Sequence, residues 1–435
     1  MKASFLLSAT ATLAVSAAMA QSQVTFTKDV APILADHCQV CHRVGQIAPM
    51  SLMTYQEARP WAKSIKAKVA AREMPPWFID KNIGVQHFQN DNSLTDDQIA
   101  TLVKWVDEGA PQGNLADMPP PKKFADGQAW QIGSPDLVVK LPKDYVLKAK
   151  GPDQWPDILV DPGLTEDRYV QAVQIIPLKG QPSIHHIRTS LVEPRGDDVV
   201  HSGQLDGNVS LETGEMGVFL NEYAIGKGGD VFREGAGRLV KAGTKVNFQF
   251  HLHSNGTETP VNVALGLKFY PLGYTPKHSV TSLTVGANEL DIRPHQADVR
   301  SDGYMPLIKP ARLLSFQPHL HNRGKAECLE AIYPNGKTEM INCARFLFNW
   351  HMNYVYDEDS APLLPAGTVL HSIMWHDNSD NARFNPDPDA QITWGQRTVD
   401  EMGSAWLSYY YMSDEDFKIE TEQRKAKQRA VTSTR

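Results

Sequence analysis

The spacing of apolar residues divides the chain into a short helical part and a longer part made of strands. Apolar residues three and four positions apart predict helices over 27–38 and 60–71. A third predicted helix opens at Thr95–Gln98, which matches a capping box, and ends near Gly109. All three segments precede residue 125, so we expect a small all-α domain there.

Beyond residue 130 the pattern changes to short β-branched and apolar runs that are separated by turn residues, for example 137–139, 170–176 and 261–267. Few helix-length periodic segments occur before about residue 412, which argues against a parallel sheet with crossover helices. We predict a multidomain chain in which a small all-α domain precedes two all-β domains of the sandwich or jelly-roll type. The predicted bounds are 21–125 for the helical domain, 130–275 and 276–415 for the β domains, and 416–435 for a charged C-terminal tail. From Glu420 onward this charged segment is either a frayed helix or a tail.

The first twenty residues have the pattern of an export signal, with Lys2, an apolar run, and small residues ending at Ala20. The run is too short for a transmembrane segment, and no later stretch approaches ~18 apolar residues. We expect 1–20 to be a signal peptide and the protein to be periplasmic or secreted from a bacterium. The 43 basic and 50 acidic residues include no basic block, which argues against nucleic acid as a partner.

One short motif indicates specific chemistry: Cys38-Gln39-Val40-Cys41-His42 is a CxxCH sequence. Its two thiols can add to the vinyl groups of one porphyrin, and the histidine that follows can be the proximal ligand of the iron. A chance CxxC or a thiol redox pair is the alternative interpretation. Three helices around such a motif are typical of a class I cytochrome c, so we predict one covalent c-type haem in 21–125.

A cytochrome of this kind needs a second axial ligand. Met74 is the best candidate because it follows the second predicted helix, and the two prolines after it hold the loop extended. Met50 is the competitor, and His87 is a weaker one. Methionine and histidine together would leave no open position on the iron, so the haem would carry electrons and would not bind oxygen.

Histidines occur in pairs in the strand-rich region: His185–His186, His251 with His253, and His319 with His321. Residues i and i+2 point to the same face of a strand, so each H-x-H pair presents two imidazoles to one face. Adjacent histidines would point to opposite faces, so a shared ion needs a bulge or a strand end there. Imidazole ligands without thiolates suit copper or zinc, and a methionine thioether favours copper.

The two remaining cysteines, Cys328 and Cys343, flank Asn335-Gly336, which is a strong signal for a two-residue hairpin turn. Counting outward from this turn places the cysteines directly opposite each other. We therefore predict a cross-strand disulfide, which export permits. In strict register the pair would be a hydrogen-bonded one, which leaves the register open.

The metal-ligand candidates lie in motifs that match one family in order. The motifs are Ile184-His185-His186, the run 247–253, the run 317–321 followed by Gly324, and Asp400-Glu401-Met402, with a turn at 365–367 and a strand ending at Asn378. With these motifs, the region from about 165 to 415 resembles the copper type II, ascorbate-dependent monooxygenases, the family of dopamine β-hydroxylase and peptidylglycine α-hydroxylating monooxygenase.

Members of that family pair two β-sandwich domains, each holding one copper, across an open cleft. The ligand sets that the resemblance implies are His185, His186 and His251 for the first copper, and His319, His321 and Met402 for the second. His253 lies near enough in sequence to compete with His251. We expect no primary-ligand role for His351, His371 or His376.

Two departures from the family bear on the substrate. Gln317 stands where the family has an arginine that holds a substrate carboxylate, and the family's Asn and Tyr after the methionine are replaced around 404–406. A peptide substrate is therefore not expected. An aromatic or otherwise uncharged small organic molecule fits better, with Trp406 lining the pocket as a hypothesis.

The resemblance implies hydroxylation of a C–H bond by O2 at the second copper, with the first copper storing and passing an electron. The fused cytochrome adds the hypothesis that a periplasmic donor reduces the haem and that the haem reduces the coppers. A non-catalytic haem and copper electron carrier would use the same ligands and is the alternative. A zinc hydrolase is a third interpretation, and Met402 argues against it because thioethers are poor zinc ligands.

Overall fold

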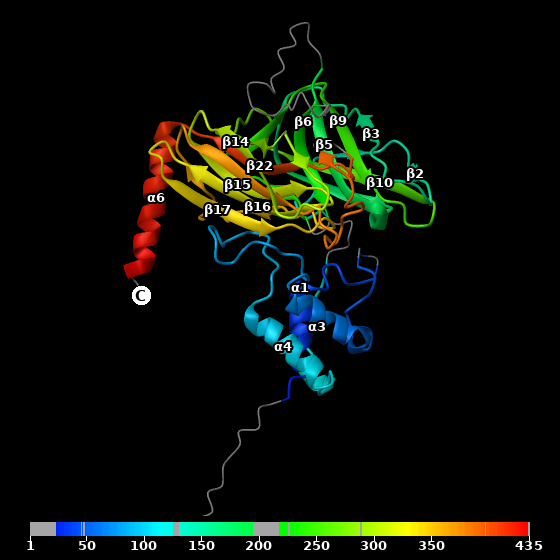
Figure 1. Ribbon diagram of the computed structural model, residues 1–435. Helices are drawn as coiled ribbons and strands as arrows, with labels where there is room; N and C mark the ends of the chain where they lie inside the picture. Colours follow the sequence, from blue (N-terminus) through cyan, green and yellow to red (C-terminus); the bar gives the residue numbers. More distant parts are fainter. Residues whose placement is uncertain are drawn as a thin grey trace, which may run out of the picture.

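The computed structural model describes residues 23–44, 46, 48–124, 130–194, 217–224, 227–287, 289–395 and 397–433. The expected signal peptide at 1–20 lies outside these residues. Most of the described chain forms β-sandwich sheets (Figure 1). Short helices occur before residue 118 and at η4 (Gln181–Ser183), and one longer helix follows residue 413. Within the described ranges, no helix combines the length and the apolar character that crossing a membrane requires.

The N-terminal helices pack around a core that includes Phe26, Leu34 and Trp105. The predicted capping box at Thr95 is confirmed, because the side chains of Thr95 and Gln98 each accept a bond from the other's backbone N–H. A second capping box, at Thr54, starts a helix that we did not predict. The elements are η1 (Phe26–Val30), α1 (Ala31–His37), α2 (Tyr55–Ala58), η2 (Arg59–Trp61), α3 (Ala62–Ala70), α4 (Asp96–Asp107) and η3 (Leu115–Asp117).

Two sheets form the first sandwich, and apolar side chains such as Ile187, Phe248 and Leu265 fill the space between them. Their strands pair antiparallel, except that β11 runs parallel to β8. Sheet 1 has the order β1 (Leu137–Lys140), β10 (Thr259–Phe269), β4 (Arg168–Lys179), β8 (Ala236–Val240) and β11 (His278–Ser279), with β2 (Tyr145–Leu147) on β10 and β7 (Asp230–Val231) on β4. Sheet 2 has the order β3 (Asp157–Val160), β9 (Lys245–Leu252), β5 (Ile184–Val192) and β6 (Val218–Ala224).

The second sandwich repeats this plan around a core that includes Leu313, Phe316, Leu329 and Leu407. Sheet 3 has the order β12 (Thr281–Gly286), β22 (Gly403–Tyr411), β15 (Ala311–Leu320) and β18 (Tyr354–Val355), with β19 (Leu363–Leu364) on β15. Sheet 4 has the order β14 (Val299–Pro306), β20 (Val369–His376), β16 (Gly324–Ile332) and β17 (Thr338–Arg345), and β13 (Asp291–Ile292) pairs with β21 (Ile392–Thr393). The prediction of two strand-rich sandwiches is therefore confirmed.

The hairpin of β16 and β17 carries the predicted disulfide, since the sulfur atoms of Cys328 and Cys343 lie 1.95 Å apart. Near the turn, Ile332 pairs with Thr338, one position off the register counted from the Asn-Gly dipeptide. A bulge at Ile341 then restores the alignment, so that the two cysteines pair directly. Their Cα atoms are 4.0 Å apart, the close spacing of a non-hydrogen-bonded pair.

Residues 77–90, which we call the strap, join the helical part to the second sandwich (Figure 1). Backbone bridges pair Ile79 with Ala344 and Phe88 with Tyr356. The side chains of Trp77, Ile79 and Phe88 are buried in the core of the second sandwich, among residues of sheets 3 and 4. The strap thus begins three residues after Met74 and fixes the helical part to that sandwich.

The C-terminal segment forms a helix, α6 (Asp414–Ser433), so of the two predicted forms of its charged end, a frayed helix or a tail, the structure has the helix. Glu420 of this helix accepts hydrogen bonds from Arg233 at 3.0 Å and from Arg312 of β15 at 2.7 Å. Because Arg233 belongs to the first sandwich and Arg312 to the second, the start of α6 ties the two sandwiches together.

Candidate metal sites in the cleft between the sandwiches

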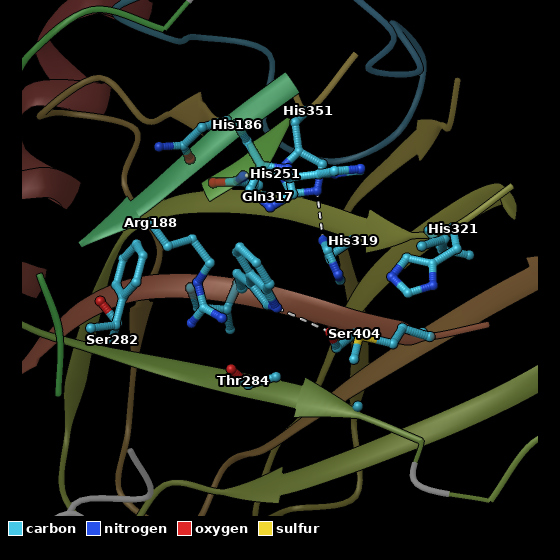
Figure 2. A pocket seen from close by; sticks show the side chains of 18 of the residues that line it. His186, Arg188, His251, Ser282, Thr284, Gln317, His319, His321, His351 and Ser404 are labelled. Carbon is cyan, nitrogen blue, oxygen red and sulfur yellow. Dashed lines mark hydrogen bonds between the residues drawn. The ribbon is translucent and has the colours of Figure 1, made fainter. Parts of the chain in front are cut away.

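The outer faces of sheet 2 and sheet 3 enclose one cleft with a cavity volume of about 690 Å³ (Figure 2). Alternate residues of a strand point to the same side, so His186 and Arg188 of β5 face the cleft together, as do Gln317 and His319 of β15. All six predicted copper ligands line this cavity: His185, His186, His251, His319, His321 and Met402. The structure therefore brings together residues that are up to 217 positions apart in the sequence.

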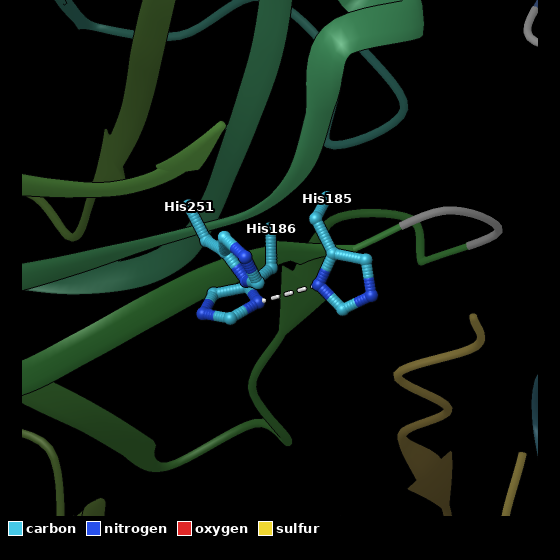
Figure 3. A group of neighbouring side chains, drawn as sticks. All are labelled: His185, His186 and His251. Carbon is cyan, nitrogen blue, oxygen red and sulfur yellow. Dashed lines mark hydrogen bonds between the residues drawn. The ribbon is translucent and has the colours of Figure 1, made fainter. Parts of the chain in front are cut away.

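Three histidines of the first sandwich form a compact group (Figure 3). One possible ligand atom from each of His185, His186 and His251 lies within 4.8 Å of the others, and the Nδ1 atoms of His185 and His186 are 3.1 Å apart. The adjacent pair sits at the start of β5, where the register with β9 shifts between Ile184 and His186. This is the irregularity that the sequence analysis required for both imidazoles to reach one ion.

Outer partners orient two of these imidazole rings. His185 Nε2 lies 3.1 Å from the carbonyl oxygen of Phe348, and His251 Nε2 lies 2.8 Å from Oδ2 of Asp153. A ring nitrogen beside such an acceptor carries the proton, which leaves the Nδ1 lone pair for an ion. Asp153 also contacts His253 Nδ1 at 2.7 Å, so the exposed His253 belongs to this outer layer. No sequence motif marks Asp153, which lies 98 positions from His251.

Two members of the three-histidine group, His185 and His186, favour the neutral imidazole, the form that binds metal ions. Burial lowers the pKa of His185 to about 3 and lowers the pKa of His186 well below its usual range. Burial opposes ionisation of Asp153, but its hydrogen bonds from His251 and His253 outweigh that effect and lower its pKa to about 2. The group thus combines neutral ligands with an anionic outer partner.

The H-x-H pair of the second sandwich is held through its backbone. Its backbone N–H groups donate to two glutamates: His319 N lies 3.1 Å from Oε2 of Glu327, and His321 N bonds to Glu401. Both carboxyls are fully buried, and burial raises the pKa of each to about 8. The imidazole rings cross at 80° with their centroids 5.5 Å apart.

Met402 stands directly before β22, on the same side of the cleft as the H-x-H pair. Its carbonyl oxygen accepts a bond from Nε2 of His376 at 3.1 Å. Trp406, four residues further along the chain, stacks on His319 with ring centroids 4.1 Å apart and an interplanar angle of 18°. The hypothesis that Trp406 lines the pocket is confirmed.

His351 is a cleft residue that the sequence analysis set aside. It comes from loop 346–353, between β17 and β18, and lies 2.6 Å (Nε2) from Nδ1 of His319. Its Nδ1 lies 3.0 Å from Oε1 of Glu222, and its ring stacks on His186 at 12° with centroids 5.0 Å apart. His351 thus lies between the two predicted ligand sets. Nothing in its sequence context pairs it with Glu222, which is 129 positions away.

The CxxCH motif follows α1, with Cys38 at the C-cap of that helix. Burial raises the pKa of Cys38 to about 12 and also raises the pKa of Cys41. His42 Nδ1 lies 3.2 Å from the carbonyl oxygen of Met50, so its Nε2 is the nitrogen left for a ligand. A backbone carbonyl is a usual outer partner of a metal-bound histidine.

The candidates for the second axial ligand differ in position. The carbonyl of Met50 lies behind His42, on the side of the imidazole opposite Nε2. A sixth ligand must approach from the other face of a haem, which favours Met74 in the loop after α3 over Met50. His87 is exposed and belongs to the strap. The choice of Met74 stays a prediction.

Comparison with known proteins identifies no family. No family model matches the chain, and no curated protein matches it. The major capsid protein P2 of bacteriophage PM2 is 8% identical, with a TM-score of 0.27 over 63% of this chain and 97% of that chain. The VP2 subviral particle of infectious bursal disease virus is 10% identical, with a TM-score of 0.19 over 63% of this chain and 72% of that chain. Such low scores carry no argument about the fold or the function.

Proposed function

We propose that the protein is an exported haem–copper monooxygenase that hydroxylates a C–H bond of a small organic substrate with O2. One observation carries the proposal: three histidines of the first sandwich line the same cleft as two histidines and a methionine of the second. These are the ligand sets of the resemblance described above, in the order in which that family has them. The distances and outer partners of the three-histidine group add independent support.

The donor atoms suit copper. The first group offers imidazole nitrogens alone, while the second adds the thioether of Met402, which favours copper over zinc. Copper bound at both sites would supply the single-electron steps by which O2, two electrons, two protons and a C–H bond become a C–OH bond and water. The chain itself fixes the ligands, through Asp153 at the first site and through Glu327 and Glu401 at the second.

The cleft wall beside the second site suits a flat, apolar substrate. The Trp406 ring lies against His319, and the Arg188 guanidinium lies 4.5 Å from the Trp406 ring centroid. Phe219, whose ring centroid is 6.3 Å from that of Trp406, extends this wall. An aromatic molecule packed against this wall would hold its C–H bond next to His319 and exclude water from it.

A covalent haem at Cys38, Cys41 and His42 would supply electrons to the cleft. The strap offers a short route, because Trp77 lies three residues after Met74 and packs edge-on against Tyr354 with ring centroids 4.9 Å apart. Tyr354 is three residues after His351, which contacts ligands of both sites. We assign the transfer of electrons from haem to cleft to this junction.

Export outside the cytoplasm fits the proposal. The disulfide between Cys328 and Cys343 is of the kind that persists in an oxidising compartment. The reductant of the haem would then be a periplasmic electron donor, and the other partners are O2 and the organic substrate. The signal peptide expected at 1–20 belongs to the same proposal.

The test compares the protein with its Cys38→Ser/Cys41→Ser variant, both loaded with copper, in a screen of aromatic substrates under isotopically labelled O2. We expect the parent protein to form a product with one labelled oxygen atom, whether a protein donor or ascorbate supplies the electrons. The variant should keep ascorbate-driven turnover and lose donor-driven turnover. Full donor-driven turnover by the variant would contradict the electron route, and haem oxidation without any hydroxylated product would indicate the electron-carrier alternative.

A further inference from the structure

We propose that His186, Glu222 and His351 form an additional metal site, which binds a divalent ion such as Zn²⁺ and joins the two sandwiches. This group differs from both predicted copper sites in its other two ligands, and it shares His186 with the three-histidine group. The proposal rests on the geometry of these three side chains and does not require the monooxygenase function.

The three side chains are arranged as a ligand set. One possible ligand atom from each lies within 4.8 Å of the others. Glu222 is 1% exposed and His351 is 4% exposed, so water competes little for these atoms. Two imidazoles and one carboxylate are a donor set used by zinc and by non-haem iron sites.

Each ligand is brought in by a different segment. His186 comes from β5, and Glu222 comes from the neighbouring β6, where His186 pairs with Ala224 and Arg188 pairs with Glu222. Side chains of β6 two residues apart point the same way, so Glu222 projects toward the cleft beside His186. His351 comes from loop 346–353 of the second sandwich, and its ring stacks on His186.

A fourth residue orients the carboxylate and the loop histidine. The Gln317 amide nitrogen donates to Oε2 of Glu222 and lies 2.9 Å from Nδ1 of His351. Gln317 faces the cleft from β15, in the place where the resembling family has an arginine. An amide can position a carboxylate without the full charge by which an arginine would compete with a metal ion. The glutamine that stands here in place of the family's arginine therefore goes together with the Glu222 carboxylate to which it donates.

His186 can serve two groups because an imidazole has two ring nitrogens on opposite edges. Its Nδ1 faces His185 at 3.1 Å, in the three-histidine group. An ion held by His186, Glu222 and His351 would take ligands from both sandwiches, which would fix the width of the cleft. It would also hold His351 in place, 2.6 Å from the predicted copper ligand His319.

The experiment measures zinc bound by the full haem-containing chain, after treatment with a chelator and dialysis against buffered Zn²⁺. Wild type is compared with Glu222→Gln, His351→Gln, His185→Ala and the double variant Glu222→Gln/His185→Ala. Glu330→Gln is the matched control, because Glu330 also contacts a buried histidine, His371, at 2.9 Å. Circular dichroism of the chelated proteins establishes that each variant is folded.

We expect Glu222→Gln and His351→Gln each to lose one equivalent of zinc and Glu330→Gln to lose none. His185→Ala should also lose one equivalent, and the double variant should lose two. Zinc content equal to wild type in both folded variants of the new site would overturn the proposal, and would indicate that Glu222 and His351 form only an ion pair between the sandwiches. A double variant that loses only one equivalent would likewise overturn it, because the two groups would then share a single ion.

Discussion

Single residues hold the two predicted copper sites in different ways. At the three-histidine site the side chains themselves have outer partners, of which Asp153 contacts both His251 and His253. At the second site the outer partners are the buried carboxyls of Glu327 and Glu401, which hold the backbone of the H-x-H pair. Substitutions should therefore weaken the first site through ring orientation and the second through strand position.

Asp153→Asn should weaken copper binding at the three-histidine site by about 10- to 100-fold, because it removes the anion that orients His251. His253→Gln is the control, since His253 is exposed and its change leaves the bond between Asp153 and His251 in place. Copper affinity, measured by competition with a chelator, gives the comparison. Equal affinities for the two variants would contradict the role assigned to Asp153.

Met402→Leu should abolish hydroxylation and weaken Cu(I) binding at the second site, while copper at the three-histidine site is retained. Leucine keeps the volume of the side chain and removes the thioether that stabilises Cu(I). Met305→Leu is the matched control, because Met305 lines the same cleft and is not a predicted ligand. Product formation and copper content are measured for both variants, and hydroxylation by Met402→Leu would show that this methionine is not a ligand.

Glu327 should make the stability of the metal-free protein depend on pH. Burial raises its pKa from the ordinary 4.5 to about 8, so the folded state binds the proton more tightly than the unfolded state does. The stabilisation of the folded state that comes from this tighter proton binding is fully present below pH 4.5 and is lost as the pH rises toward 8. Between pH 5 and 8 the free energy of unfolding of Glu327→Gln should rise relative to wild type by on the order of 3 kcal/mol. Urea unfolding of both proteins at pH 5 and at pH 8 tests this prediction. A difference in the free energy of unfolding that is the same at the two pH values would contradict it.

The residues that sequence could identify are those with a local pattern. H-x-H and His-His follow from strand geometry, and even the bulge at His185–His186 follows from the need to turn both rings to one side. Asp153, Glu222 and His351 carry no such pattern, because each acts on a histidine from another segment of the chain. Their roles depend on tertiary contacts that spacing alone does not encode.

At the scale of elements, the strap decides how the helical part is placed. Its side chains complete the core of the second sandwich, and its backbone bonds to β17 through Asp80 N and the carbonyl oxygen of Cys343 at 2.8 Å. The contact between Trp77 and Tyr354 lies within this junction. The strap should therefore contribute both to stability and to electron transfer.

Trp77→Ala should lower the free energy of unfolding by about 3 kcal/mol, because it removes a buried ring from a packed core. Trp61→Ala is the control, since Trp61 is 43% exposed on the helical part and should cost under about 1 kcal/mol. Urea unfolding followed by circular dichroism compares the two variants. Equal losses would mean that the strap does not support the second sandwich.

Elements with capping or turn signals could be predicted closely. The capping box at Thr95 and the Asn-Gly hairpin both give the right elements, although a bulge shifts the register on the way to the cysteines. The strap could not be predicted, because 77–90 has neither helical nor strand periodicity and gains its order from the second sandwich. For the charged C-terminal segment the sequence left a frayed helix and a tail open, because the contacts of Phe417 and Glu420 that fix the helix are made with distant residues.

The molecule has three parts, of which the two sandwiches enclose the cleft and the helical part is joined to the second sandwich. Sheet 2 and sheet 3 form its walls, loop 346–353 crosses between them, and the strap joins the helical part to the sandwich that carries the loop. The two-sandwich architecture could be predicted from strand patterns, and the ligand order came from a resemblance. The position of loop 346–353 in the cleft could not be predicted, since it depends on how the two sandwiches face each other.

We propose that the chain carries one covalent haem and two copper sites, and that the copper sites lie on opposite walls of this cleft. The most direct measurement is the haem and copper content of the copper-reconstituted protein, with the Cu(II) electron paramagnetic resonance spectrum, for wild type, His185→Ala and His319→Ala. We predict a c-type haem spectrum with one haem per chain, and the loss of one copper and its own distinct signal in each variant. The absence of bound copper in the wild type, or the loss of the same signal in both variants, would contradict the account.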